Sequence, residues 1–155
     1  MATETIHKLD NQEVEETLRS VIQSLIDGQE GFKTIGERLD DETLKRYFAA
    51  ESLKRAQFRG ELEEVLHQEG VHDVKEKGTV GGAVHRAWGD IKAHLGGGDH
   101  TLLETAEGGE DSAKKTYKVA LDKNLPLPIK QLLVTQFAHI ETSHDYVKAA
   151  RDSHK

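Results

Sequence analysis

The feature that most constrains the fold is a run of apolar residues at steps of three and four that continues from residue 14 to residue 39. Its members are Val14, Leu18, Val21, Leu25, Gly28, Phe32, Ile35 and Leu39. This spacing places all of them on one face of an α-helix. Runs with the same period follow over residues 42–69, 101–123 and 128–152, and the only two prolines, Pro126 and Pro128, stand together between the last two runs. The chain is therefore predicted to be all-α.

The lengths of the connections predict how the helices are arranged. Asp41 can cap a helix over 42–69 directly after the first helix, and the prolines mark a short turn before the last one. Short turns join antiparallel neighbours, so we expect two antiparallel hairpins. Between the hairpins lie about thirty residues that include a shorter predicted helix over 79–95. We expect a ferritin-like four-helix bundle with a short crossover helix, forming a single domain over 11–153 after a flexible tail over 1–10.

Composition excludes several classes of function. The 28 acidic and 21 basic residues give a net charge of −7, which disfavours nucleic acid and anionic membranes as partners. No apolar run approaches the roughly 18–20 residues of a membrane span, and no signal-peptide pattern follows Met1, so a cytoplasmic location is expected. The chain has no cysteine, which removes disulfides, thiolate zinc sites and thiol chemistry.

A carboxylate and an imidazole on the last helix suggest a metal site. Glu141 and His144 have the Glu-x-x-His spacing, and we expect both to point into the bundle. Ferritin-like carboxylate proteins bind two metal ions with such pairs on two helices and a single glutamate on each of the others. The candidate ligands are therefore Glu30, Glu110, Glu141 and His144, and carboxylate and imidazole donors suit iron or manganese.

The second helix departs from this pattern. It carries Glu51 and then Lys54 where a histidine ligand would stand, and Arg55 follows on the apolar face. A cation there would repel a metal pair and neutralise a carboxylate instead. The alternative is a buried polar network around Glu51, Lys54 and Arg55, in which Glu30 pairs with Arg55 and Glu110 pairs with His144. A single or partial metal site and a dinuclear site remain as the other two interpretations.

Glycines inside two predicted helices form part of a weak internal repeat. Asp27-Gly-Gln-Glu-Gly-Phe in the first helix is echoed by Glu107-Gly-Gly-Glu-Asp-Ser in the helix over 101–123. Each glycine costs a helix roughly 1 kcal/mol relative to alanine. Two interpretations are open: the glycines allow close contact between helices, or they make room for a carboxylate at the bundle axis.

Three segments also resemble a known family. They are DGQEGF, then VGGAVHRAWGDIKAHLGGGDHTLLETAEGGED, and then LPLPIKQLL. They are similar to a bacterial family of ferritin-like four-helix bundles known as a domain of unknown function, and the similarity covers residues 14–151. The most specific parts are the crossover motif with His85, Arg86 and Trp88 and the segment GGGDHTLLETAEGGED. The resemblance implies a ferritin-like bundle in a cytosolic, stress-associated bacterial protein, and it implies no activity.

Two functions from different classes follow. The first is a non-catalytic bundle with a degenerate metal site and no cofactor, which acts by protein association, as a homodimer or with another protein, in a stress response. The cations at Lys54 and Arg55 favour it, and the sequence shows no nucleophile beside a base. The alternative is an iron- or manganese-binding carboxylate protein that handles iron or peroxide.

Overall fold

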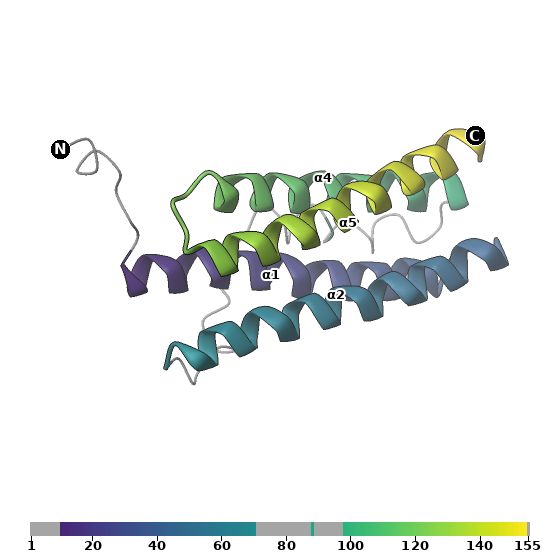
Figure 1. Ribbon diagram of the computed structural model, residues 1–155. Helices are drawn as coiled ribbons and strands as arrows, with labels where there is room; N and C mark the ends of the chain where they lie inside the picture. The colour runs from purple at the N-terminus through teal and green to yellow at the C-terminus, as the bar shows by residue number, and fades with distance from the viewer. Residues whose placement is uncertain (1–9, 71–87, 89–97, 155) are drawn as a thin grey trace.

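The described part of the chain consists of four α-helices (Figure 1). The computed structural model describes residues 10–70, 88 and 98–154. The helices are α1 (Asn11–Gly36), α2 (Glu42–Gln68), α4 (Asp99–Leu121) and α5 (Leu127–Ser153). Among these residues the all-α prediction is confirmed. Apart from Trp88, the predicted crossover helix over 79–95 lies outside the described residues, as does most of the predicted tail.

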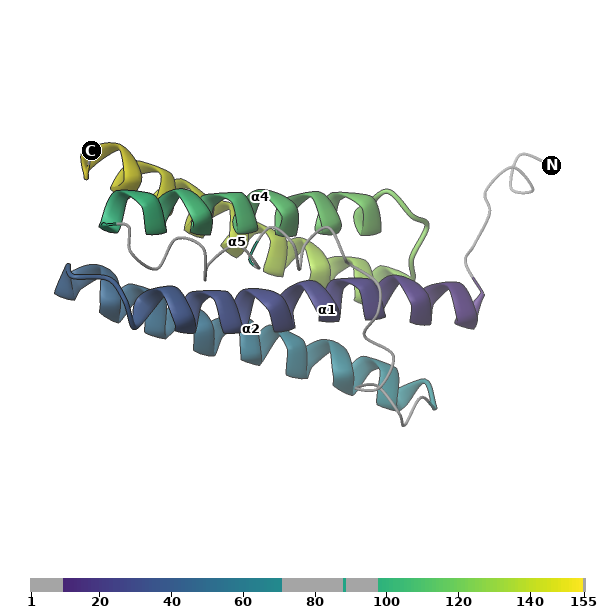
Figure 2. The same ribbon diagram turned by 180° about the vertical axis from the view of Figure 1, so that it is seen from behind.

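The helices form a bundle of two hairpins. α1 packs against α2, α4 packs against α5, and α1 also lies along α4. Figures 1 and 2 show that α2 and α4 run in one direction while α1 and α5 run in the other. Consequently α2 ends at one end of the bundle and α4 begins at the opposite end. The two predicted antiparallel hairpins are present.

Side chains next to the helix ends set where α1 and α2 begin. Asp10 caps α1 through a reciprocal pair, in which Glu13 N donates to Asp10 Oδ1 at 2.8 Å and Asp10 N donates to Glu13 Oε1 at 3.1 Å. At α2 the prediction is confirmed, because the carboxylate of Asp41 accepts from Leu44 N at 3.0 Å.

One end of the bundle is tied together by acidic side chains and a histidine. The carboxylate of Asp99, at the start of α4, accepts from Asp40 N at 2.8 Å and from Asp41 N at 3.0 Å. His154, after α5, has Nδ1 2.8 Å from Ala150 O and Nε2 3.2 Å from Asp41 Oδ2. Both ring nitrogens face acceptors, and these contacts raise the pKa of His154 above its ordinary value. The turn between α1 and α2 is thereby joined to α4 and α5.

The core consists of two apolar clusters. Every member of the apolar run over residues 14–39 is buried, as predicted, although α1 ends at Gly36 and Leu39 lies in the turn that follows. The first cluster includes Leu18, Leu25, Phe58, Leu62, Tyr117, Leu133 and Ile140, and the second includes Phe32, Ile35, Phe48, Leu103, Trp88 and Val147. Between them, the inward positions carry Glu51 and Arg55 on α2, Glu110 on α4 and Ser143 on α5. A polar layer therefore crosses the bundle between two apolar halves.

The mid-helix glycines make room for a tryptophan. The indole of Trp88, which is 3% exposed, lies against Gly31 of α1 and Gly109 of α4. A Cβ atom at either position would overlap the indole ring. The ring also packs on Phe32, with centroids 5.3 Å apart. At Gly31 and Gly109 the space is thus taken by an aromatic side chain, which neither interpretation of the glycines had named.

Substitution of Gly109 by alanine is expected to destabilise the protein by about 1–3 kcal/mol, because overpacking against Trp88 outweighs the gain in helix propensity. Gly108 is the matched control, since it is exposed, lies in the same helix and has no neighbouring atom within 4 Å of the place that a methyl group would take. Gly108→Ala should stabilise the protein by up to about 1 kcal/mol. Urea unfolding followed by circular dichroism measures both, and equal stabilisation by the two variants would contradict this packing.

Candidate functional site

The polar layer is built around a fully buried arginine. Arg55 is 1% exposed, and its Nη1 and Nη2 donate to the two oxygens of Glu110 at 2.8 and 3.1 Å. Nη2 also donates to Glu51 Oε1 at 3.1 Å. Burial alone would lower the pKa of Arg55, but the charges of Glu110 and Glu51 outweigh it and the pKa is raised. The guanidinium is therefore held as a cation at the centre of the bundle.

Further polar groups complete this layer. Ser143 of α5 donates to Glu110 Oε2 at 2.6 Å, and His139 Nε2 lies 2.9 Å from Glu51 Oε2. From α1, the ring of Phe32 lies under the guanidinium, with the ring centroid 4.8 Å from Arg55 Cζ. The layer thus connects α2, α4 and α5 through charged hydrogen bonds. Because these hydrogen bonds require particular atoms of the three helices to face each other, the layer fixes the register of α2, α4 and α5.

The predicted network is correct in part. Glu51 and Arg55 are buried and paired as expected, but the partner of Arg55 across the bundle is Glu110. Glu30 is exposed. The buried residues of α1 before and after it lie on the inward face of the helix, and Glu30 lies on a different face. Lys54 lies outside the network, half-buried, with Nζ 5.8 Å from the centroid of the Phe58 ring.

The predicted ligand set is not brought together. Glu110 is committed to Arg55, and Glu141 is exposed. The expectation that Glu141 points into the bundle is wrong, because the inward face of α5 runs through Ile140, Ser143 and His144. Of the predicted ligands, only His144 lies in a group of metal-ligating side chains among the described residues.

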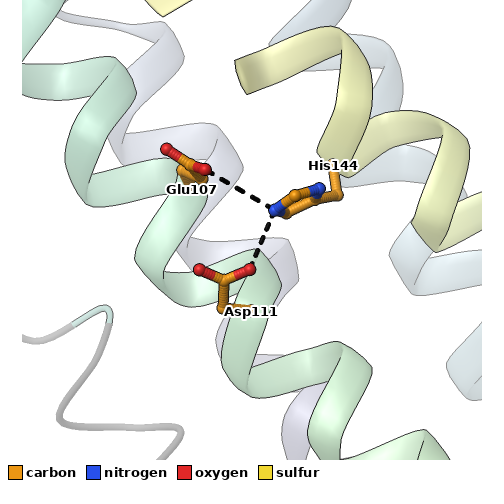
Figure 3. A group of neighbouring side chains, drawn as sticks. All are labelled: Glu107, Asp111 and His144. Carbon is orange, nitrogen blue, oxygen red and sulfur yellow. Dashed lines mark ion pairs between the residues drawn. The ribbon is translucent and has the colours of Figure 1, made fainter.

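His144 faces two carboxylates of α4 (Figure 3). Glu107 and Asp111 lie one turn apart on α4, and His144 approaches them from α5 with its side chain 9% exposed. Its Nε2 lies 2.8 Å from Asp111 Oδ1 and 3.7 Å from Glu107 Oε2. One ligand atom from each of the three side chains lies within 4.8 Å of the others. The side chain of Glu107 is 13% exposed and that of Asp111 is 61% exposed, so one edge of the group is open to solvent.

The two ring nitrogens of His144 have different surroundings. Nδ1 lies 3.1 Å from Asp145 Oδ1 in hydrogen-bonding geometry. Nε2 is buried and has no aligned hydrogen-bond partner among the described residues, despite its short distance to Asp111. A carboxylate at Nδ1 favours the tautomer that carries its hydrogen there, which leaves a lone pair on Nε2 in the neighbourhood of Glu107 and Asp111. One donor atom from each of the three side chains therefore lies close to the other two, which makes this group the candidate site.

Sequence reasoning identified His144 but missed the partners that surround it. Glu107 and Asp111 carry a usable signal, since carboxylates four residues apart share one face of a helix. Placing that face opposite His144 requires the register between α4 and α5. The polar layer supplies this register, because Glu110 and Ser143, which bond each other, are the sequence neighbours of Asp111 and His144.

The fold and the site define an all-α protein built as a bundle of four described helices, with a buried charge layer and a carboxylate–histidine group beside it. The chain belongs to the family described as Domain of unknown function (DUF2383), whose model matches residues 13–123. The match includes Glu107 and Asp111 and ends before α5, which carries His144. No curated protein matches the chain. Within the described ranges, none of the helices has the length and apolar character needed to cross a bilayer.

Replacing Arg55 by methionine is expected to cost about 3–5 kcal/mol of stability, because two buried carboxylates lose their counter-charge. Removing the main partner as well, in R55M/E110M, should recover part of that loss. Lys54→Met is the control, since Lys54 is half-buried and should change stability by less than about 1 kcal/mol. Urea unfolding of the variants provides the measurement. A similar loss for R55M and K54M would show that the layer does not hold the bundle.

Proposed function

We propose that this chain is a non-catalytic, ferritin-like bundle that binds one divalent metal ion between α4 and α5. The observation that carries the proposal is the buried Nε2 of His144, which lies 2.8 Å from Asp111 Oδ1 and 3.7 Å from Glu107 Oε2 without an aligned hydrogen-bond partner among the described residues. The helix directions, with α2 and α4 parallel, support the ferritin-like part of the proposal.

The spacing of the donor atoms suits a metal ion. For bonds of about 2.1 Å, neighbouring ligand atoms lie about 3–3.5 Å apart. The two distances from Nε2 lie on either side of this range, so small side-chain rotations suffice to complete the site. One imidazole and two carboxylates are donors that iron(II) and manganese(II) accept readily. Zinc also accepts them, and we therefore propose iron or manganese as the preferred ion with zinc as a competitor.

A proton is the natural competitor for this site. A proton at Nε2 would make the ring of His144 a cation between Asp111 and Asp145, whose carboxylate oxygens lie 2.8 and 3.1 Å from its two nitrogens. Metal binding replaces that proton at Nε2, while Asp145 retains the hydrogen at Nδ1 and orients the ring. The affinity for metal should consequently fall as the solution is acidified. This dependence separates a metal site from a simple ion pair.

A dinuclear centre is not part of the proposal. The carboxylates that would bridge two metal ions at the bundle axis, Glu51 and Glu110, are hydrogen-bonded to Arg55. The guanidinium supplies there the positive charge that metals would supply in a ferritin-like carboxylate protein. At the proposed site, three protein ligands leave coordination positions on the solvent side, beside the exposed Asp111. Such a site can take up and release a metal ion.

Protein association is a second candidate function. Leu53, Leu127 and Val134 are apolar and 73%, 65% and 50% exposed, and the last two share one face of α5 because they are seven residues apart. We propose that this face contacts a second copy or another protein, in keeping with a cytoplasmic role in a bacterial stress response. Light scattering after size-exclusion chromatography decides whether a dimer forms, since a mass of one chain would exclude it.

The wild-type protein is expected to bind one Mn(II) per chain, and His144→Ala should abolish this binding while leaving helicity unchanged. The reason is that the variant removes the one nitrogen donor of the group and its contact with both carboxylates. Electron paramagnetic resonance of free Mn(II) during titration measures the bound fraction, and circular dichroism measures helicity.

Glu141→Gln is the matched control for this experiment. Glu141 is an exposed acid on the same helix, one turn before His144, and should be dispensable. Loss of binding in E141Q would restore the ligand set predicted from the sequence. If His144→Ala kept the wild-type stoichiometry, or if the wild type bound no Mn(II), the proposed site would be wrong.

A further inference from the structure

The carboxylate of Glu107 is shared between two neighbours. Its Oε2 is directed toward Nε2 of His144, and its Oε1 accepts a hydrogen bond from Nη1 of Arg151. Arg151 lies in the last turn of α5, seven residues after His144, and therefore on the same face of the helix. Its side chain is 25% exposed. A permanently charged guanidinium is thus hydrogen-bonded to Glu107, one of the proposed metal ligands.

This guanidinium is held in place from both sides. Asp152 Oδ1 accepts from Arg151 Nε at 3.1 Å and from Nη2 at 2.9 Å, opposite the bond to Glu107. The backbone carbonyl of Arg151 lies 3.0 Å from His100 Nδ1, which ties the last turn of α5 to the start of α4. With these contacts the side chain stays beside the site, and an arginine cannot release its proton to lower its charge.

We propose that Arg151 is the residue that sets the metal affinity of this site, by competing with the metal ion for the charge of Glu107. This inference rests on the proposed function. Two cations that share one carboxylate repel each other, and the carboxylate is a weaker donor while it bonds to a guanidinium. Arg151 thereby lowers the metal affinity of the site, so that a bound metal ion can be released. By reciprocity, bound metal weakens the Arg151–Glu107 pair by the same factor.

The nearest other cation on this face supplies a control. Lys148 is exposed and lies four residues after His144 and three before Arg151, so it shares their side of α5. It gives a way to change the local charge by the same amount without removing the hydrogen bond to Glu107. The effect of Arg151 is expected to exceed that of Lys148, because Arg151 is bonded to the ligand itself.

The test is a Mn(II) titration of the wild type, R151Q, R151K and K148Q in low salt, with helicity checked in each. R151Q is expected to bind Mn(II) about three- to tenfold more tightly than the wild type. R151K should stay within about twofold of the wild type because the charge is retained. K148Q should change the affinity by less than about twofold, since exposed charges are screened. R151M replaces R151Q if the glutamine variant fails to fold.

The possible outcomes separate this inference from the proposed function. If R151Q bound Mn(II) more weakly than the wild type, Arg151 would only position Glu107. If K148Q tightened Mn(II) binding as much as R151Q does, the effect would come from the overall local charge and not from the bond to Glu107. Either result overturns the inference and leaves the metal site intact. An absence of Mn(II) binding in every protein, the wild type included, overturns both. A final check is E107Q/R151Q, which should show no gain over E107Q, since the effect passes through Glu107.

Discussion

The bundle depends on the ion pair between Arg55 and Glu110 at its centre. A guanidinium that is 1% exposed is tolerated only because Glu110 binds it through both oxygens and Glu51 accepts a further hydrogen bond. The pair links α2 to α4, and Ser143 extends the link to α5. Apolar contacts on either side of this layer are non-directional, whereas its hydrogen bonds require particular atoms to face each other. The layer therefore determines which residues of α4 and α5 lie opposite each other.

The same register produces the proposed metal site. Glu110 and Ser143 face the bundle axis, while the adjacent residues, Asp111 and His144, are turned by about 100° toward the outer seam between the two helices. Two chemically different sites therefore occupy neighbouring positions on α4 and α5. In the inner site an arginine neutralises the carboxylates permanently. In the outer site we propose that the histidine exchanges a proton for a metal ion, and the exposed Asp111 opens the site to solvent.

Much of the fold follows from the sequence, because apolar period and turn residues act locally. The stripe on α1, the cap at Asp41 and the two hairpins are all present as predicted. The site was harder to predict, since it depends on rotations of a fraction of a turn. Glu30 and Glu141 are exposed, but each is next to a buried residue in the sequence. An error of one residue in the predicted inward face therefore placed both side chains in the core. The role of Gly31 and Gly109 depends on Trp88, which is distant in sequence and could not be placed by periodicity.

The most direct test of the proposed site is a crystal structure of the protein soaked in Mn(II), with the metal located by its anomalous scattering. We predict one peak per chain, within about 2–2.4 Å of His144 Nε2 and of an oxygen of Glu107 and of Asp111. We also predict no peak beside Arg55, where the guanidinium already neutralises Glu110. A peak between Glu51 and Glu110 with Arg55 displaced, or no peak at His144, would contradict the assignment of the metal to the outer site.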